Sequence, residues 1–239
     1  MAVTQNACLS INGPKTLTNA LAEDDNADET LNDALNRHKI KLPDDQIAQL
    51  DQYCQLLWDW NTRLNLTRHT NYDKFVSRDV VDSLQLAALL DENEEVLDVG
   101  TGGGVPGIIL AILRPDLRLS LSESVGKKAK AVDAIVEEMK LPVAFFQGRA
   151  EDVLGDFRFT SLVARAVGPL WKMLKWFEPH WLYIGKLLAV KGPKWLDERL
   201  EAKERGLLRK VELRKVASYP VAGNDGESVI LKIWPKRSG

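Results

Sequence analysis

The feature that most constrains this chain is a glycine-rich turn, Asp98-Val-Gly-Thr-Gly-Gly-Gly-Val-Pro-Gly107, between an apolar run over 96–99 and a helical pattern over 105–113. Glycine lets the chain turn tightly and lets a ligand approach the backbone with no Cβ in the way. The free N–H groups at the start of the following helix favour a negatively charged group. A strand, this turn and a helix in direct succession therefore predict an α/β fold that binds a nucleotide-like ligand at the end of the strand.

Around this turn, strands and helices alternate. Short apolar runs predict strands over 96–99, 117–121, 143–146, 161–164 and 185–190, with a helix over 126–140 between the second and the third. Such alternation requires crossover connections, so these strands should lie parallel. Two further strands, 210–218 and 228–234, flank a turn at 223–226 and predict an antiparallel hairpin at one edge. We expect a Rossmann-like α/β fold with a mostly parallel, seven-stranded sheet.

The part of the chain before the turn has a different pattern. Residues 1–27 are polar and acidic and show no periodicity, which is typical of a flexible tail. Apolar residues recur at three- and four-residue steps from Ile47 to Leu64, and a second apolar pattern covers 71–90. Both patterns predict helices. The expected organisation is therefore an acidic tail over 1–27, a helical segment over 28–92 and a ligand-binding domain over 93–239.

Charge and cysteine content exclude several classes of protein. The 32 basic and 34 acidic residues give a net charge of −2, which excludes a strongly basic nucleic-acid binder at the level of the whole chain. Residues 186–215 hold ten bases and five acids, a stretch that either contacts phosphate or forms a solvated helix. No apolar run is long enough to span a bilayer, and no secretory signal is visible. Cys8 and Cys54 form neither a disulfide framework nor a metal quartet, so we expect a cytoplasmic protein without a metal site.

The glycine turn allows two interpretations of the ligand. Gly102, Gly104 and Gly107 satisfy G-x-G-x-x-G, the dinucleotide fingerprint. The same stretch reads D-x-G-x-G-x-G and so resembles motif I of the class I S-adenosylmethionine (SAM) methyltransferases. Glu123, at the end of the second predicted strand, can accept hydrogen bonds from ribose hydroxyls in either case.

A wider set of motifs extends the second interpretation. The chain resembles the RsmG (GidB) family, bacterial methyltransferases that modify guanine N7 in 16S ribosomal RNA. The resemblance runs from about residue 30 to the end, and its most specific part is the proline-glycine extension of the glycine turn. The other matching residues are Trp60-Asn61, Asn65-Leu66-Thr67, Asp82-Ser83, Arg114-Pro115, Gly126-Lys127-Lys128, Arg149-Ala-Glu151, Arg165-Ala166, Lys191-Gly192 and Asp225-Gly-Glu227.

The resemblance implies a class I methyltransferase domain behind N-terminal helices, with SAM as cofactor and 16S rRNA or the small ribosomal subunit as partner. The family's cofactor residues carry over to Gly100, Val105, Ala150, Glu151 and Arg165. The glycine turn and the end of the second strand add three residues on physical grounds: Gly102, Gly104 and Glu123.

Three positions depart from the family's pattern. Where the family has R-H-x-x-D-S, this chain has an aspartate, Asp79, in place of the histidine. Where the family has L-D-S, this chain has the longer acid Glu123. Where the family has G-E-R-H, this chain has Ser228 in place of the arginine. Cofactor binding should survive all three changes. The lost histidine and arginine bear on the rRNA target.

The chemistry of guanine N7 predicts which residues are needed. N7 carries a lone pair and no proton, so its attack on a sulfonium methyl needs no general base. The enzyme mainly has to align N7, the methyl carbon and the sulfur. We therefore assign no catalytic acid or base. His38, His69 and His180 are interpreted as ordinary surface or core residues.

Basic residues that follow strands or open helices should gather on one rim of the site. Lys127, Lys128, Arg149 and Lys191 are the candidates for contacts to RNA phosphate. Arg165 can stack on a base, bond to it, or orient the cofactor carboxylate. Trp171 is expected to border the cofactor crevice, and the other tryptophans are interpreted mostly as core.

Three other functions compete with an rRNA methyltransferase that acts as a monomer. A SAM enzyme for a small molecule or a protein fits the near-neutral charge. An NAD-linked oxidoreductase fits the glycine count, but no Tyr-x-x-x-Lys or Cys/His pair supports hydride chemistry. A binding module without activity is supported by the departures at Asp79 and Ser228.

Overall fold

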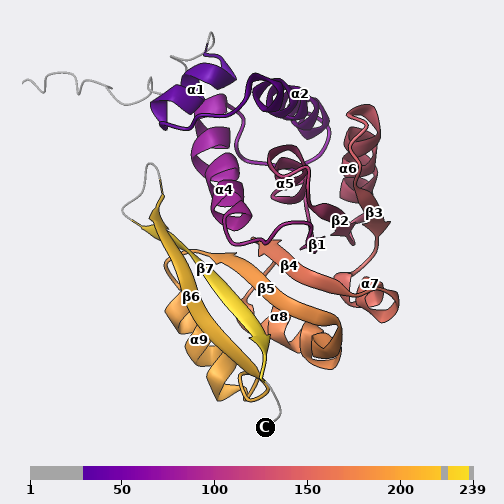
Figure 1. Ribbon diagram of the computed structural model, residues 1–239, viewed down its shortest axis with the longest axis vertical. Helices are drawn as coiled ribbons and strands as arrows, with labels where there is room; N and C mark the ends of the chain where they lie inside the picture. Colours follow the sequence, from indigo (N-terminus) through magenta and orange to yellow (C-terminus); the bar gives the residue numbers. More distant parts are fainter. Residues whose placement is uncertain (1–28, 222–225, 237–239) are drawn as a thin grey trace, which may run out of the picture.

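The computed structural model describes residues 29–221 and 226–236 and contains a single mixed sheet (Figure 1). Its strand order is β3-β2-β1-β4-β5-β7-β6, and β7 is antiparallel to both β5 and β6, whereas the other neighbours are parallel. This confirms the predicted mostly parallel sheet with its hairpin at one edge. The strands are β1 Glu95–Val99, β2 Arg118–Glu123, β3 Ala144–Gln147, β4 Phe159–Arg165, β5 Ile184–Lys191, β6 Val211–Pro220 and β7 Glu227–Pro235.

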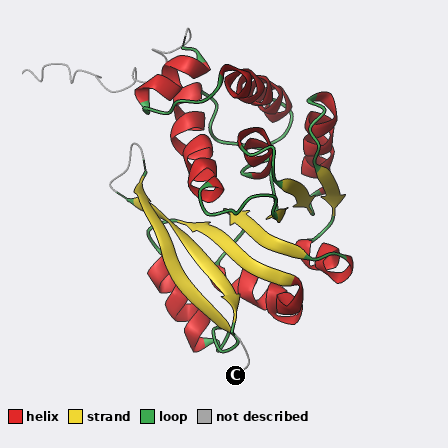
Figure 2. Cartoon of the chain, viewed as in Figure 1, coloured by secondary structure: helices red, strands yellow, loops and turns green. Residues whose placement is uncertain are grey.

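Helices cover both faces of the sheet (Figure 2). One face packs against α7, α8 and α9, and the other against α4, α5 and α6. Helices α1 and α2 lie outside α5 and share its core. The helices are α1 Leu31–Arg37, α2 Asp44–Asn61, α3 Tyr72–Lys74, the π-helical η1 Phe75–Val80, α4 Val81–Ala87, α5 Gly107–Leu113, α6 Gly126–Glu138, α7 Ala150–Asp156, α8 Leu170–Phe177, the 3-10 helix η2 Glu178–Tyr183 and α9 Trp195–Glu204.

The differences from the sequence-based expectation have local causes. The helix expected over 71–90 is found as α3, η1 and α4, with a π-helical turn in its middle. Helices α7 and α8, of seven and eight residues, were not expected, because segments this short show no clear helical period and, unlike α5, follow no glycine-rich turn that signals a helix start. The expected tail over 1–27 and most of the turn at 223–226 lie outside the described residues.

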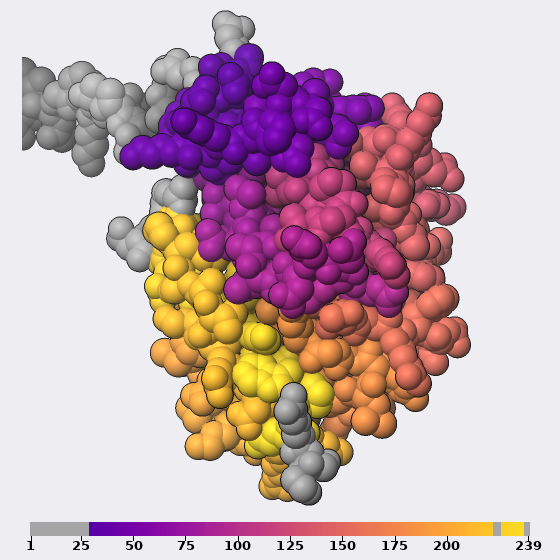
Figure 3. Space-filling view, viewed as in Figure 1, coloured from indigo at the N-terminus to yellow at the C-terminus, as the bar shows by residue number. Residues whose placement is uncertain are grey.

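The N-terminal helices are part of the main core. Leu50, Tyr53, Cys54 and Leu57 form the buried stripe of α2 and belong to the same apolar cluster as Ile108 of α5. Cys54 is therefore a packing residue, as expected, and its burial raises the pKa of its thiol. In the space-filling view this N-terminal part, coloured indigo, lies directly against the magenta and rose parts of the chain (Figure 3). This packing brings 66–69 and Asp79 to the carboxyl ends of the strands.

Candidate functional site

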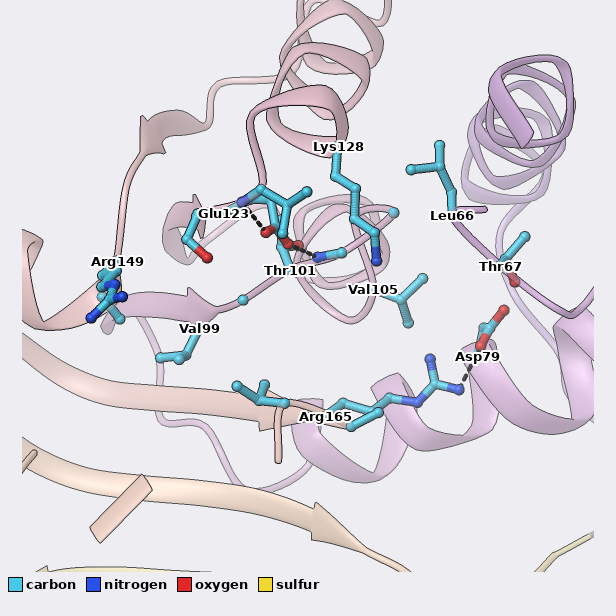
Figure 4. A pocket seen from close by; sticks show the side chains of 18 of the residues that line it. Leu66, Thr67, Asp79, Val99, Thr101, Val105, Glu123, Lys128, Arg149 and Arg165 are labelled. Carbon is cyan, nitrogen blue, oxygen red and sulfur yellow. Dashed lines mark hydrogen bonds and ion pairs between the residues drawn. The ribbon is translucent and has the colours of Figure 1, made fainter. Parts of the chain in front are cut away.

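A pocket of about 730 Å³ lies at the carboxyl ends of β1, β2 and β4 (Figure 4). This is the edge at which open α/β sheets bind their ligands, and the volume is that of a small-molecule site. Four segments of the sheet domain line the pocket, and a fifth group comes from the N-terminal helices. The lining segments are 99–103 with Val105, 123–125 with Lys128, 148–151, 165–167 with Trp176, and 66–69 with Leu57 and Asp79.

The glycine turn has the backbone conformation that the sequence predicts. Gly100 and Gly102 have φ values of +62° and +64°, in the left-handed region that favours glycine. A Cβ on Gly107 would lie 2.1 Å from Leu121 Cδ2, so this glycine allows α5 to pack closely on β2. The turn therefore exposes backbone to the pocket at its beginning and packs tightly at its end.

Asp98 fixes the turn from below. Its Oδ2 accepts hydrogen bonds from Thr101 Oγ1 at 2.5 Å and from the Gly107 N–H at 2.9 Å. The carboxylate is fully buried, and Oδ1 has no hydrogen-bond partner among the residues that the structure describes. Burial raises the pKa of Asp98 to about 7, although the bonds from Thr101 and Gly107 act in the opposite direction.

Glu123 fixes the turn from the side. It lies at the end of β2 and accepts hydrogen bonds from the Gly102 N–H at 2.9 Å and the Val125 N–H at 2.7 Å. The carboxylate is only 5% exposed, yet it lines the pocket. An acid in this place suits a ribose diol, as the sequence argument proposed.

The structure brings most of the predicted cofactor residues together. Gly100, Gly102, Val105, Glu123, Ala150, Glu151 and Arg165 all line the pocket. Gly104 does not, because it faces α5 and α2 instead: a Cβ there would meet Ile108 Cδ1 at 2.6 Å and the Tyr53 hydroxyl at 3.0 Å. Its φ of +106° and this close approach explain the glycine by packing rather than by ligand contact.

The four candidates for RNA contact occupy different environments. Lys128 and Arg149 line the pocket, and Lys127 is exposed outside it. Lys191 is 8% exposed: its Nζ lies 2.7 Å from Glu198 Oε2 and donates to the Gly168 carbonyl at 2.6 Å. Lys191 therefore lies inside the fold, not on the expected rim.

Arg165 is held by two carboxylates. Its Nη2 lies 2.6 Å from Asp79 Oδ1, and its Nε donates to Asp82 Oδ2 at 2.7 Å. Burial of Arg165 disfavours the charged form, but the two carboxylates outweigh this effect and raise the pKa of the guanidinium. Tyr219 donates to Asp82 Oδ1 at 2.7 Å, which ties the group to β6. The guanidinium is thus a fixed part of the pocket wall.

Sequence reasoning missed much of the N-terminal wall. Thr67, Arg68, His69 and Asp79 line the pocket, although their spacing gave no sign of it apart from the family motif around Thr67. Trp171 was expected at the crevice, but its ring packs under the Arg205 guanidinium at 4.1 Å, and Trp176 lines the pocket instead. Helix α8 begins at Leu170, and this turn of the helix directs Trp171 away from the pocket.

The described ranges 29–221 and 226–236 contain neither a metal-binding cluster of side chains nor a membrane-spanning helix. No group of three or more His, Cys, Asp or Glu side chains there is placed to hold a metal ion. None of the helices in those ranges is long and apolar enough to cross a membrane.

Comparison with known proteins shows a family and a fold. The model of the GidB family, described as rRNA small subunit methyltransferase G, matches residues 46–224. A ribosomal RNA small subunit methyltransferase G of Rhodopirellula baltica is 54% identical, covering 79% of this chain and 81% of its own. One from Marinobacter nauticus is 36% identical, covering 84% and 92%. An O-methyltransferase from Bacillus cereus, solved in complex with SAH, shares the fold with a TM-score of 0.56 at 15% identity, covering 85% of this chain and 96% of that one.

Proposed function

Because the chain belongs to the GidB family, the family of rRNA small subunit methyltransferase G, we propose that it transfers a methyl group from SAM to N7 of a guanine in 16S rRNA. The observation that carries this proposal is the composition of the pocket. Its sheet side has a glycine turn, an acid at the end of β2 and the segment 148–151, whereas its other side comes from the N-terminal helices. One pocket thus has room for a nucleoside-like cofactor and a second group.

The pocket residues fit SAM by their chemistry. Gly100, Gly102 and Val105 offer backbone and an apolar contact, and Glu123 offers a carboxylate for the ribose. The resemblance to the family implies that Ala150 and Glu151, at the start of α7, flank the adenine. Arg165 closes the end of β4. SAM, when bound, supplies an electrophilic methyl on a positively charged sulfur.

The residues of this chain have to hold a guanine in line with that methyl and exclude water, without moving a proton. Leu57, Leu66 and Val105 provide apolar wall. Lys128 and Arg149 lie where they can contact RNA phosphate, and exposed Lys127 extends this rim. We propose a monomer acting on 16S rRNA or the small subunit, and therefore in the cytoplasm where ribosomes assemble.

Methyl transfer from labelled SAM to small subunits and to free 16S rRNA tests the proposal, with both substrates taken from a strain that lacks N7 methylation. Cleavage at N7-methylguanine maps the label. We expect label at one guanine, and its loss in Gly100→Arg, since Gly100 has φ +62° and a Cβ there would lie 3.3 Å from Val167 Cγ1. Gly155→Arg is the matched control, because Gly155 has no atom within 4 Å of such a Cβ.

Absence of label from both substrates, with SAM still bound in a parallel titration, would reject the proposed target. Label on a small molecule or a protein would then identify a SAM enzyme of another class. Label shared among many guanines would contradict a single positioned target base.

A further inference from the structure

A histidine–carboxylate pair lies on the wall that the N-terminal helices contribute to the pocket. His69 Nδ1 is 2.8 Å from Asp79 Oδ1, and both residues line the pocket. The His69 side chain is 23% exposed, and that of Asp79 only 1%. Figure 4 shows Asp79 beside Thr67 and Arg165, at the end of the pocket away from Arg149. The proposed methyl transfer requires no acid or base, so this pair has another role.

The pairing fixes which nitrogen of His69 carries a proton. A carboxylate oxygen only accepts, so Nδ1 donates to Asp79, and the neutral ring keeps a lone pair on Nε2. Asp79 is itself fixed by Arg165 Nη2 at 2.6 Å. Within the described part of the chain, Nε2 of His69 has no hydrogen-bond partner. The ring thus presents an oriented acceptor on a pocket wall.

Asp79 carries a second oxygen inside the wall. Asp79 Oδ2 is buried and has no hydrogen-bond partner among the described residues. An unpaired buried oxygen costs free energy. The Nδ1–H bond and the Nε2 lone pair of an imidazole point to opposite sides of the ring, so Nε2 is directed away from Asp79 and is the acceptor that a ligand donor can reach, whereas Asp79 Oδ2 is enclosed in the wall.

The segment that carries His69 is held in place before any ligand arrives. Asn61 Oδ1 accepts hydrogen bonds from the backbone N–H groups of Leu66 at 2.8 Å and Thr67 at 3.0 Å. Trp58 Nε1 donates to the His69 carbonyl at 2.8 Å. Because these bonds involve the backbone of 66–69, the imidazole can be replaced without releasing the segment.

Guanine carries the matching edge. Its N1–H and 2-amino group are adjacent donors on the side of the purine opposite N7, whereas adenine has an acceptor at N1 and no 2-amino group. We propose that His69 Nε2 accepts a hydrogen bond from this donor edge of the target guanine while Asp79 holds the ring in place, an inference that rests on the proposed function. A base held in this way directs N7 away from the pair and toward the cofactor side of the pocket. Arg165 is then a positioning residue, acting through Asp79.

The test combines a change in the protein with a change in the base. Small subunits with guanine or adenine at the mapped position are methylated by wild type, His69→Phe and His69→Gln. We expect His69→Phe to lower the guanine-over-adenine ratio of kcat/KM by about tenfold to a hundredfold. His69→Gln should restore part of it, because its amide oxygen can accept. The matched control is His180→Phe, a histidine in η2 outside the pocket, which should keep the wild-type ratio.

Binding of SAH, measured by calorimetry, separates the target from the cofactor. SAH affinity within about twofold of wild type in His69→Phe supports a contact to the base. A parallel loss of SAH affinity and activity would assign the pair to the cofactor and overturn the inference. Full discrimination of guanine from adenine by His69→Phe would also overturn it and would leave the proposed function standing.

A second readout does not depend on methyl transfer. The chain has three histidines, so the ring resonances of His69 can be assigned by substitution and followed by NMR in the SAH-loaded protein. GMP should shift them, and AMP at the same concentration should not. If subunits take no label, the proposed function fails, and this response to GMP still supports the base contact. Equal responses to GMP and AMP, or none, would overturn it.

Discussion

Asp98 and Glu123 hold the glycine turn through backbone N–H groups from two directions. Asp98 bonds to the Gly107 N–H and Glu123 to the Gly102 N–H, both at 2.9 Å. Asp98 is fully buried, and its charge has no cationic partner within ion-pair distance in the described ranges. The two acids therefore perform different tasks: Glu123 lines the pocket, whereas Asp98 supports the turn from beneath, with an effect on stability that depends on pH.

The raised pKa of Asp98 predicts a pH-dependent stability. A carboxyl whose pKa rises from 3.8 to about 7 on folding binds its proton more tightly in the folded state. The stabilisation that this proton gives to the folded state is complete below about pH 4 and is lost as pH rises through 7. Asp98→Asn has no such proton to lose. In urea unfolding, the free energy of unfolding of the variant minus that of wild type should therefore rise by up to about 4 kcal/mol between pH 4 and 8. A constant difference across this range would contradict the assignment.

At the scale of elements, α2 supports the glycine turn. The Tyr53 hydroxyl, fully buried, donates to the Gly103 carbonyl at 2.9 Å. A Cβ on Gly103 would lie 2.9 Å from Leu57 Cδ1. The N-terminal helices thus contact the glycine turn directly, as well as forming the second wall of the pocket.

Tyr53→Phe tests this support. The variant keeps the ring and leaves the Gly103 carbonyl without its donor, so the free energy of unfolding should fall by about 1 kcal/mol. SAH affinity should fall several-fold, because the turn that binds it is less well fixed. Calorimetry and urea unfolding measure the two effects, and Tyr183→Phe in η2 is the control. Unchanged SAH affinity in Tyr53→Phe would limit the hydrogen bond to stability.

The ends of β5 and α6 carry lysines with different expected roles. Lys191 joins β5 to α9 through Glu198, and Glu198 also accepts from the Leu170 N–H at 2.7 Å at the start of α8. Lys191→Met should lower the free energy of unfolding by about 2 kcal/mol and keep the salt dependence of rRNA binding. Lys128→Met should reduce the slope of log affinity against log salt by about one and leave stability unchanged. Filter binding across salt concentrations checks both, and the reverse pattern would move Lys191 to the RNA interface.

At the scale of the whole molecule, one polar group joins three distant parts of the sequence. Arg165 at the end of β4 pairs with Asp79 in η1 and with Asp82 in α4, and Asp82 accepts from Tyr219 in β6. The apolar cluster of α1, α2, α5 and α6 crosses the boundary between the N-terminal helices and the sheet. The helices before β1 are therefore built into the fold.

This shared core predicts a single unfolding transition. Tryptophans lie in both parts, with Trp58 and Trp60 in α2 and Trp171 and Trp176 in α8. Urea unfolding followed by tryptophan fluorescence and by far-UV circular dichroism should give coincident curves. Two separated transitions would show that the N-terminal helices unfold as a unit of their own.

The sequence by itself determined the sheet, the glycine turn and most of the sheet side of the pocket. These features depend on local signals: apolar runs with the period of strands or helices, and glycines where the backbone needs a positive φ, as at Gly100 and Gly102. Parallel strands then bring their carboxyl ends to one edge. Glu123, Ala150 and Arg165 meet there although they lie far apart in the chain.

Only the tertiary structure decided the second wall and the state of the charges. His69 meets Asp79 because helical turns and a hydrogen-bonded loop bring them together, and no spacing rule in the sequence predicts that contact. Lys191 and Arg165 looked alike as cations after strands, yet Lys191 is paired with one carboxylate inside the fold and Arg165 with two at the pocket. Whether a charged side chain meets a partner or solvent depends on what packs across from it. That is a property of the folded chain, because the partners come from elements distant in sequence.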